Sequence, residues 1–249
     1  MDSFFDIFGG MLNTGTSFLE GLFGDSDVDE KNEINNSEGV EYSDTDLERI
    51  ETVADIMGEV FTDEVISNWE NLSIEERASY LNEYYAKAGQ ALGIDTKGVY
   101  VDDLQALYGQ GVQGVNSGDG YLGIDITLVA DASRLEELLD TTTHEMRHQL
   151  QNDALRNPSA FPDIPEETLE QWQYEMNNYI DGTYDFEAYA SQAIEVDARA
   201  FAEEVVNDFM SDVTTDTYSM GKPEFDIYAD VVSDDEQADD RISLQAHQG

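Results

Sequence analysis

Apolar residues recur three and four positions apart along most of the chain, which is the spacing of an amphipathic helix. The clearest example begins at Ser73-Ile74-Glu75-Glu76, a Ser-x-x-Glu capping box, and ends before Gly93. A second such pattern, Ser133-Arg134-Leu135-Glu136, predicts the start of a helix that runs to about Leu155. In all, the pattern predicts helices over residues 43–60, 73–92, 133–155, 166–179 and 187–210.

One stretch follows the two-residue period of a strand instead. Leu122, Ile124, Ile126 and Leu128 alternate with small or polar residues, after a glycine-rich region. We expect a half-buried strand over residues 122–129, in a small, twisted, largely antiparallel sheet above the helix that carries the chemistry. An extended peptide could pair with such a strand by strand addition. The predicted fold class is α+β and mostly helical.

The ends of the chain differ from its centre. Residues 1–24 carry apolar residues at helical spacing, residues 25–42 form an acidic linker, and residues 211–249 form an acidic tail with weak patterning. The folded domain is expected over residues 43–210. The first segment predicts an amphipathic helix, which either docks onto a protein assembly or a membrane surface or folds back on its own domain.

Charge is the most unusual property of the composition. The chain has 56 acidic and 11 basic residues, a formal net charge of -45. Salt screens such repulsion, with a Debye length of about 3 Å at 1 M. The balance therefore predicts a halophilic protein from a salt-accumulating host, such as a haloarchaeon or one of its viruses. It also excludes nucleic acid as a partner, since no basic patch is present to neutralise phosphates.

The chain lacks cysteine and also lacks the sequence features of secreted and membrane-spanning proteins. The chain has no cysteine, which excludes disulfides, thiolate metal ligands and thiol nucleophiles. The N-terminus lacks the features of a secretory signal, and no apolar run reaches the roughly 18 residues that a membrane-spanning helix needs. We therefore expect a cytoplasmic protein or a component of a virus particle.

Two of the three histidines, His144 and His148, are four residues apart on the helix predicted over 133–155. At about 3.6 residues per turn both side chains project from one face, close enough to share a metal ion. Glu145 follows the first histidine, where it can accept a proton from water without binding the metal itself. The segment 144–148 therefore predicts a metal site with Glu145 as general base.

A zinc site needs a third protein ligand, and a carboxylate is expected because only His247 remains among the histidines. Glu195 and Asp197 lie in a stretch of small and apolar residues, where a buried carboxylate is costly without a cation or a donor. Glu195 is the candidate ligand. Asp197 is either a ligand or a residue that orients a ligand histidine. The alternative for both is a solvated helix face.

Residues 144 to about 204 resemble a family of zincin-like metallopeptidase domains from bacteria, archaea and their mobile elements. In that family a His-Glu-x-Arg-His-x-x-Gln helix precedes a Trp…Asn…Tyr…Tyr…Gln…Glu-x-Asp-Ala…Phe-Ala stretch. This chain has His-Glu-Met-Arg-His-Gln-Leu-Gln at residues 144–151. The later stretch is matched by Trp172, Asn178, Tyr179, Tyr189, Gln192, Glu195, Asp197, Ala198, Phe201 and Ala202. The resemblance implies a zincin fold with Glu195 as the third ligand, in the gluzincin manner.

These observations predict a zinc metallopeptidase that hydrolyses a peptide or protein substrate. Zinc is favoured because two histidines and a glutamate leave a coordination position open. Candidate donors to the oxyanion are Tyr179, Tyr184 and Tyr189. Arg147 is expected in an ion pair behind the site, and Trp172 in the core.

One alternative belongs to another class of protein. The chain could be a structural or assembly protein, for example a virus-particle component, that retains a zincin fold and is anchored through residues 1–24. A toxin-like effector is a further alternative, for which the sequence has no targeting signal. The observations that separate these interpretations are whether residues 1–24 are buried against other chains and whether a metal ion occupies the site.

Overall fold

The computed structural model describes residues 12–13, 42–180, 182 and 184–219 of the chain. The chain divides into two compact units, Met1–Val213 and Thr214–Gly249, and of the second only the end of one helix is described. The segments predicted over residues 1–24, 25–42 and 211–249 therefore lie largely outside the described residues. Of the predicted N-terminal helix only residues 12–13 are described, and they form a short strand.

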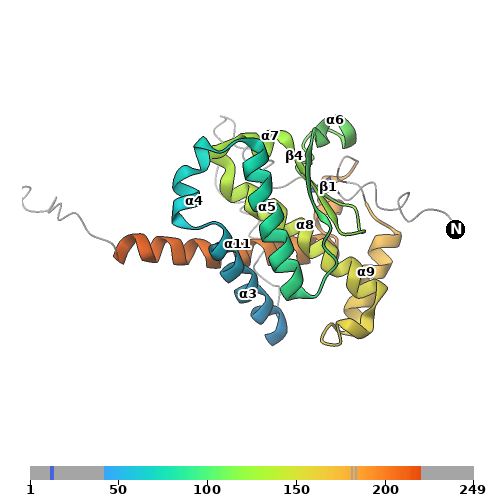
Figure 1. Cartoon of the computed structure of the whole chain (residues 1–249). Helices are drawn as coiled ribbons and strands as arrows, with labels where there is room; N and C mark the ends of the chain where they lie inside the picture. The colour runs from blue at the N-terminus through green and yellow to red at the C-terminus, as the bar shows by residue number, and fades with distance from the viewer. Residues whose placement is uncertain (1–11, 14–41, 181, 183, 220–249) are drawn as a thin grey trace, which may run out of the picture. The chain divides into compact units, whose positions relative to one another are not determined.

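The described residues are mostly helical with one small sheet, so the α+β class is confirmed (Figure 1). The helices are α3 (Asp44–Val60), α4 (Asp63–Asn68), α5 (Ile74–Leu92), α6 (Leu104–Tyr108), α7 (Ile126–Ala130), α8 (Leu135–Arg156), α9 (Glu166–Asn177), α10 (Phe186–Ala190) and α11 (Ala193–Ser219). The strands are β1 (Leu12–Asn13), β2 (Gly98–Asp102), β3 (Gly114–Asn116) and β4 (Tyr121–Asp125). No helix among these residues is long and apolar enough to cross a membrane.

Local capping signals locate α5 as predicted. The Ser73 hydroxyl accepts a hydrogen bond from the Glu76 backbone N–H at 3.2 Å, and the Glu76 carboxylate accepts one from the Ser73 N–H at 2.8 Å. At the other end Gly93 adopts φ 72°, a left-handed conformation that glycine reaches without strain. The capping box predicted at Ser133 is wrong, because the Asp131 carboxylate takes both the N–H and the hydroxyl of Ser133. Helix α8 begins only at Leu135.

The strands follow the order β1-β3-β4-β2. Strands β2 and β4 are parallel over five residue pairs, whereas β3 pairs antiparallel with both β4 and β1. The expectation of a largely antiparallel sheet is therefore wrong, and the sheet is mixed. The reason is the connection between β2 and β4. The chain passes through α6 and then runs back along β3, so β4 starts at the same end of the sheet as β2 and is parallel to it.

The strand predicted over residues 122–129 is also too long. It ends at Asp125, whose carboxylate accepts a hydrogen bond from the Thr127 N–H at 3.0 Å and so starts α7. Ile126 and Leu128 are therefore helical residues whose spacing imitated a strand. Because β4 lies between β3 and β2, it has no free edge, and the expected strand addition to it is wrong.

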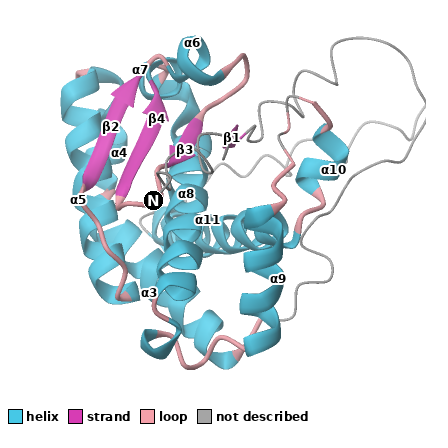
Figure 2. Ribbon diagram, turned by 90° about the vertical axis from the view of Figure 1, so that its right-hand side faces the viewer, coloured by secondary structure: helices cyan, strands magenta, loops and turns pink. Residues whose placement is uncertain are grey.

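Helices α5 and α8 cover one face of the sheet (Figure 2). Leu122 and Ile124 of β4 belong to the main core on this face, with Met146 and Leu150 of α8 among its members. The other face carries a smaller cluster around Val115. Helix α11 crosses α8 (Figures 1 and 2), and the candidate site forms between these two helices.

The single helix predicted over residues 187–210 is two helices, α10 and α11. The break falls at Gln192, whose side-chain amide accepts a hydrogen bond from the Ile180 N–H at 2.9 Å and donates one to the Ile180 carbonyl at 3.2 Å. This clasp ties the chain before α10 to the start of α11. As a result Glu195 lies in the first turn of α11.

Candidate metal centre

The two histidines predicted as ligands lie side by side on α8. His144 and His148 are each about 1% exposed, and their Nε2 atoms are 3.0 Å apart. The separation follows from the helix, since residues four apart project from the same face one turn apart. Their rings meet nearly edge to face, at an interplanar angle of 83°.

Glu195 reaches the same point from α11. One carboxylate oxygen lies 3.4 Å from His144 Nε2, and the other lies 3.5 Å from His148 Nε2. A tetrahedral ion bound at about 2.0–2.1 Å holds its ligand atoms roughly 3.3 Å apart. The Nε2 atoms of His144 and His148 are 3.0 Å apart, and each lies 3.4 or 3.5 Å from a different oxygen of Glu195, separations close to that value. The structure thus brings His144, His148 and Glu195 together as a buried group that could hold a metal ion.

Two tyrosine hydroxyls orient the Glu195 carboxylate. Tyr179 donates to Oε1 at 3.0 Å and Tyr189 donates to Oε2 at 2.8 Å. These two candidates for the oxyanion donor therefore bind the ligand carboxylate in this structure. The third candidate, Tyr184, is 90% exposed. Sequence reasoning did not anticipate the contacts to Glu195, because Tyr179 precedes α10, Tyr189 lies within it, and Glu195 lies in the next helix.

Gln151 sets the orientation of the His148 ring. Its amide nitrogen donates to the Ile194 carbonyl at 2.9 Å and to the Asp197 carboxylate at 2.7 Å. Both partners are acceptors, so the other end of the amide must be the oxygen. That oxygen lies 2.7 Å from His148 Nδ1, which must therefore be the donor. The hydrogen bond leaves His148 Nε2 as the nitrogen that faces Glu195 and a metal ion.

Asp197 lies behind the site and does not belong to the ligand group. Its carboxylate accepts two hydrogen bonds from Arg147, each at 2.8 Å, as well as the bond from Gln151. Arg147 is buried and also pairs with Asp46 at 3.1 Å. The expected ion pair is thus confirmed, and of the two roles predicted for Asp197 the structure supports orientation of a histidine, through Gln151.

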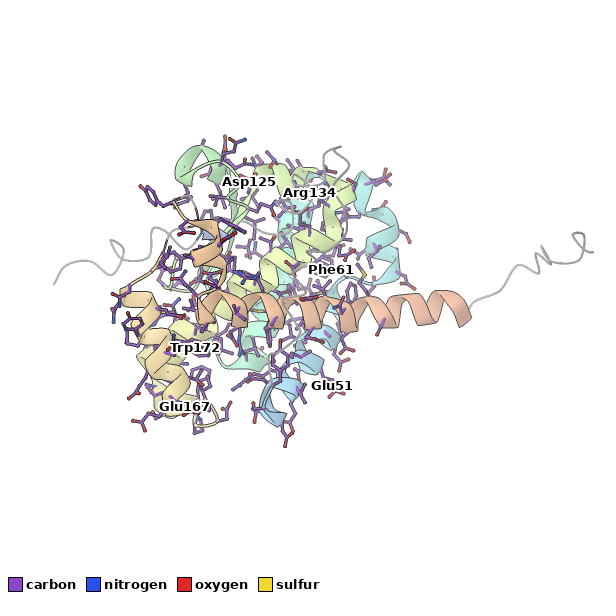
Figure 3. The ribbon with its side chains drawn as sticks, turned by 180° about the vertical axis from the view of Figure 1, so that it is seen from behind. Glu51, Phe61, Asp125, Arg134, Glu167 and Trp172 are labelled. Carbon is purple, nitrogen blue, oxygen red and sulfur yellow. The ribbon has the colours of Figure 1, made fainter. Side chains whose placement is uncertain are left out.

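Aromatic side chains enclose this ion pair. The Arg147 guanidinium carbon lies 4.7 Å from the ring centre of Phe201 and 6.0 Å from that of Trp172. Trp172 is buried, and Figure 3 labels it beside the first turns of α11. The expectation that Trp172 belongs to the core is confirmed.

Glu145 is fully buried beside the ligand group, and neither of its carboxylate oxygens has a hydrogen-bond partner among the described residues. Burial raises the pKa of this carboxyl to about 8. Strand β3 presses against it: a Cβ added to Gly114 would lie 2.8 Å from both Cγ and Oε1 of Glu145. A buried carboxylate left without partners points to a missing polar or cationic group.

The pKa values of the two histidines shift in opposite directions. Burial lowers the pKa of His144 to about 4. Burial also opposes the charged form of His148, but the carboxylates of Glu195 and Glu145 outweigh it and raise the pKa of His148 to about 9. The pKa of Glu195 lies below its usual range, since burial is outweighed by His148 and by hydrogen bonds from both histidines.

A row of buried amides joins the sheet to α8, and sequence reasoning missed it. Asn116 of β3 donates to the Glu145 carbonyl and to the Gln149 side-chain oxygen, both at 3.1 Å. Asn152 donates to Asn116 at 3.2 Å, and the Gly120 N–H donates to Gln149 at 3.2 Å. These bonds fix β3 against the turn of α8 that carries Glu145. The sequence signal was weak: Gln149 and Asn152 closely follow the segment 144–148, and Asn116 lies in the glycine-rich region.

No protein-family model, no curated protein and no solved structure matches this chain. What bears on the chemistry of the centre is its geometry: a buried His/His/Glu group that could hold a metal ion, next to a glutamate without a hydrogen-bond partner among the described residues.

Proposed function

We propose that this chain is a zinc-dependent peptide hydrolase with a zincin-like catalytic domain of the gluzincin type. One observation carries the proposal. His144, His148 and Glu195 form a buried group in which the two Nε2 atoms are 3.0 Å apart and each lies 3.4 or 3.5 Å from a Glu195 oxygen, and the carboxylate of Glu145 lies beside them without a hydrogen-bond partner among the described residues. A purely structural metal site would have no use for that carboxylate.

Zinc fits this donor set better than magnesium or calcium, which prefer oxygen ligands. When bound, zinc polarises a carbonyl group and lowers the pKa of water to about 7. The roles of the protein residues follow from their positions. Gln151, held by Asp197, orients His148, and Tyr179 and Tyr189 orient Glu195. Glu145 accepts the proton of the attacking water and returns it to the leaving amine.

The test has two stages. The first compares the metal content of wild type, Glu195→Ala, Glu195→Gln and the control Glu203→Ala, all purified in concentrated salt and supplied with zinc. Glu203 is an exposed residue of the same helix, so its substitution leaves the ligands in place. We expect about one zinc ion per chain in the wild type and the control. Binding should be lost or much weaker in both Glu195 variants.

The second stage measures hydrolysis of a mixture of quenched fluorescent peptides by wild type and Glu145→Gln. The variant should keep its zinc and lose activity, because the glutamine cannot accept a proton. Absence of zinc in the wild type would overturn the proposal. Zinc binding without hydrolysis would favour the alternative of a structural protein that retains the metal site.

A further inference from the structure

Strand β3 is the strand nearest the candidate site, and apart from the two-residue strand β1 nothing pairs with its outer side among the described residues. Its residue Gly114 has no side chain, and its backbone lies directly against Glu145, as the 2.8 Å approach of an added Cβ to that carboxylate indicates. Neighbouring strands are about 4.8 Å apart. A strand added to the outer edge of β3 therefore runs one strand spacing from the backbone that contacts the proposed general base.

This edge suits the capture of a peptide backbone. Sheet edges that must stay unpaired usually carry charges or proline. Strand β3 has the sequence Gly-Val-Asn and has neither, in a chain with 56 acidic residues. The buried amides of Asn116 and Gln149 hold the strand rigidly on α8. An extended peptide could pair with such an edge through its main chain alone.

In this structure the chain itself occupies that edge. Leu12 pairs with Val115 and Asn13 pairs with Gly114, in antiparallel register. The residue opposite Gly114, and therefore closest in register to Glu145, is Asn13. A segment from the beginning of the sequence thus lies where a substrate bound by strand addition would lie.

We propose that the strand Leu12–Asn13 is an intramolecular, substrate-like strand that blocks the peptide-binding edge of the site. The inference rests on the proposed peptidase function. A tethered segment acts at an effective concentration on the order of millimolar, so it excludes most free peptides unless it is displaced. Removing this strand from β3 exposes the outer edge of β3 and raises the rate of peptide hydrolysis.

The experiment keeps the full chain and breaks only the pairing. The double variant Leu12→Pro/Asn13→Pro removes two backbone N–H groups and cannot form the ladder with β3. The matched control is Asn36→Pro, which makes the same kind of change outside the strand. Two quantities are measured for wild type, double variant and control: kcat/KM on the peptide mixture, with zinc supplied, and hydrogen exchange of the amides in residues 112–117.

We expect the double variant to exchange faster over residues 112–117 and to show kcat/KM at least tenfold above wild type, with the control unchanged. Adding Glu145→Gln to the double variant should abolish the gain. Equal exchange in wild type and double variant, or equal kcat/KM in all three proteins, would overturn the inference and leave the proposed function standing. Zinc binding with no hydrolysis by all three proteins, the double variant included, would overturn both.

Discussion

The Nδ1–H of His148 donates to the side-chain oxygen of Gln151 at 2.7 Å. Gln151 lies on the same helix, and its amide nitrogen is anchored on α11 by the Ile194 carbonyl and by Asp197. One side chain thus orients a ligand on α8 and connects that ligand to the helix that carries Glu195. The arrangement of His148 relative to Glu195 therefore rests on a contact between α8 and α11.

Replacing Gln151 with methionine should weaken zinc binding by about 10- to 100-fold, the usual effect of removing a partner that orients a metal-bound histidine. Competition with a chromophoric chelator measures the affinity. Gln149→Met is the matched control, since Gln149 is a buried amide on the same helix that bonds to β3 instead of to a ligand. Equal losses in the two variants would contradict a specific role for Gln151.

The buried ion pair between Arg147 and Asp197 should contribute strongly to stability. Arg147→Met leaves Asp197 without its cation, and we expect the free energy of unfolding to fall by about 3 kcal/mol. Urea titration in concentrated KCl gives the value. Arg49→Met serves as control, because Arg49 pairs with Asp46 and Asp163 in a more exposed setting. A comparable loss in the control would refute the special weight given to the buried pair.

The correct predictions of local structure depend on near neighbours in sequence, although a local pattern failed at Ser133, and most contacts between distant residues were not predicted. The capping box at Ser73 and the helical pairing of His144 with His148 involve residues three or four apart. The break of the last helix at Gln192 depends on bonds to Ile180, twelve residues away, and no periodicity signals it. Burial of a carboxylate among apolar residues was enough to nominate Glu195 without revealing the tyrosines that hold it.

The site strand requires glycine at residue 114. Gly114→Ala would place a methyl group 2.8 Å from Glu145 and from Thr141. We expect a loss of about 1–3 kcal/mol in stability and impaired peptide hydrolysis, while zinc binding persists because no ligand is touched. Gly58→Ala in α3 is the control: its added methyl group meets only Phe209, at 3.9 Å, and should stabilise the helix slightly. Full stability and activity of Gly114→Ala would show that β3 is not packed on Glu145.

Asp140 should make the protein less stable as the pH rises. Burial raises the pKa of this carboxyl from 3.8 to about 7, with smaller contributions from Glu203, Glu137 and Glu136 against Arg199. Between these values the folded protein binds a proton that the unfolded chain has lost, so this contribution to stability falls from about pH 4 to pH 7.

Asp140→Asn should remove that slope and stabilise the protein at pH 8 by on the order of 1 kcal/mol, since one pKa unit corresponds to about 1.4 kcal/mol and partial exposure weakens the effect. Thermal unfolding at pH 5 and pH 8 tests this. Asp55→Asn, the same change at an exposed position, should leave the slope as it is. An unchanged slope in Asp140→Asn would rule the explanation out.

The net charge of -45 should make folding dependent on salt. We expect the unfolding temperature to rise between 0.2 and 3 M KCl, concentrations chosen to span Debye lengths from about 7 Å to below 3 Å. Sucrose at equal osmolality is the control for exclusion effects that do not involve charge. If sucrose stabilised the protein as much as KCl does, charge screening would not be the cause.

Tyr179 and Tyr189 hold the Glu195 carboxylate in place through the protein alone. The orientation of this side chain is therefore set without a metal ion, so on the proposed function an ion would bind and leave without rearranging its site. The same ligand set would discriminate between ions. Potassium and magnesium are oxygen-seeking ions and would gain little from two imidazole nitrogens. A scarce ion with an affinity for nitrogen would then be selected over abundant ones by the ligands alone.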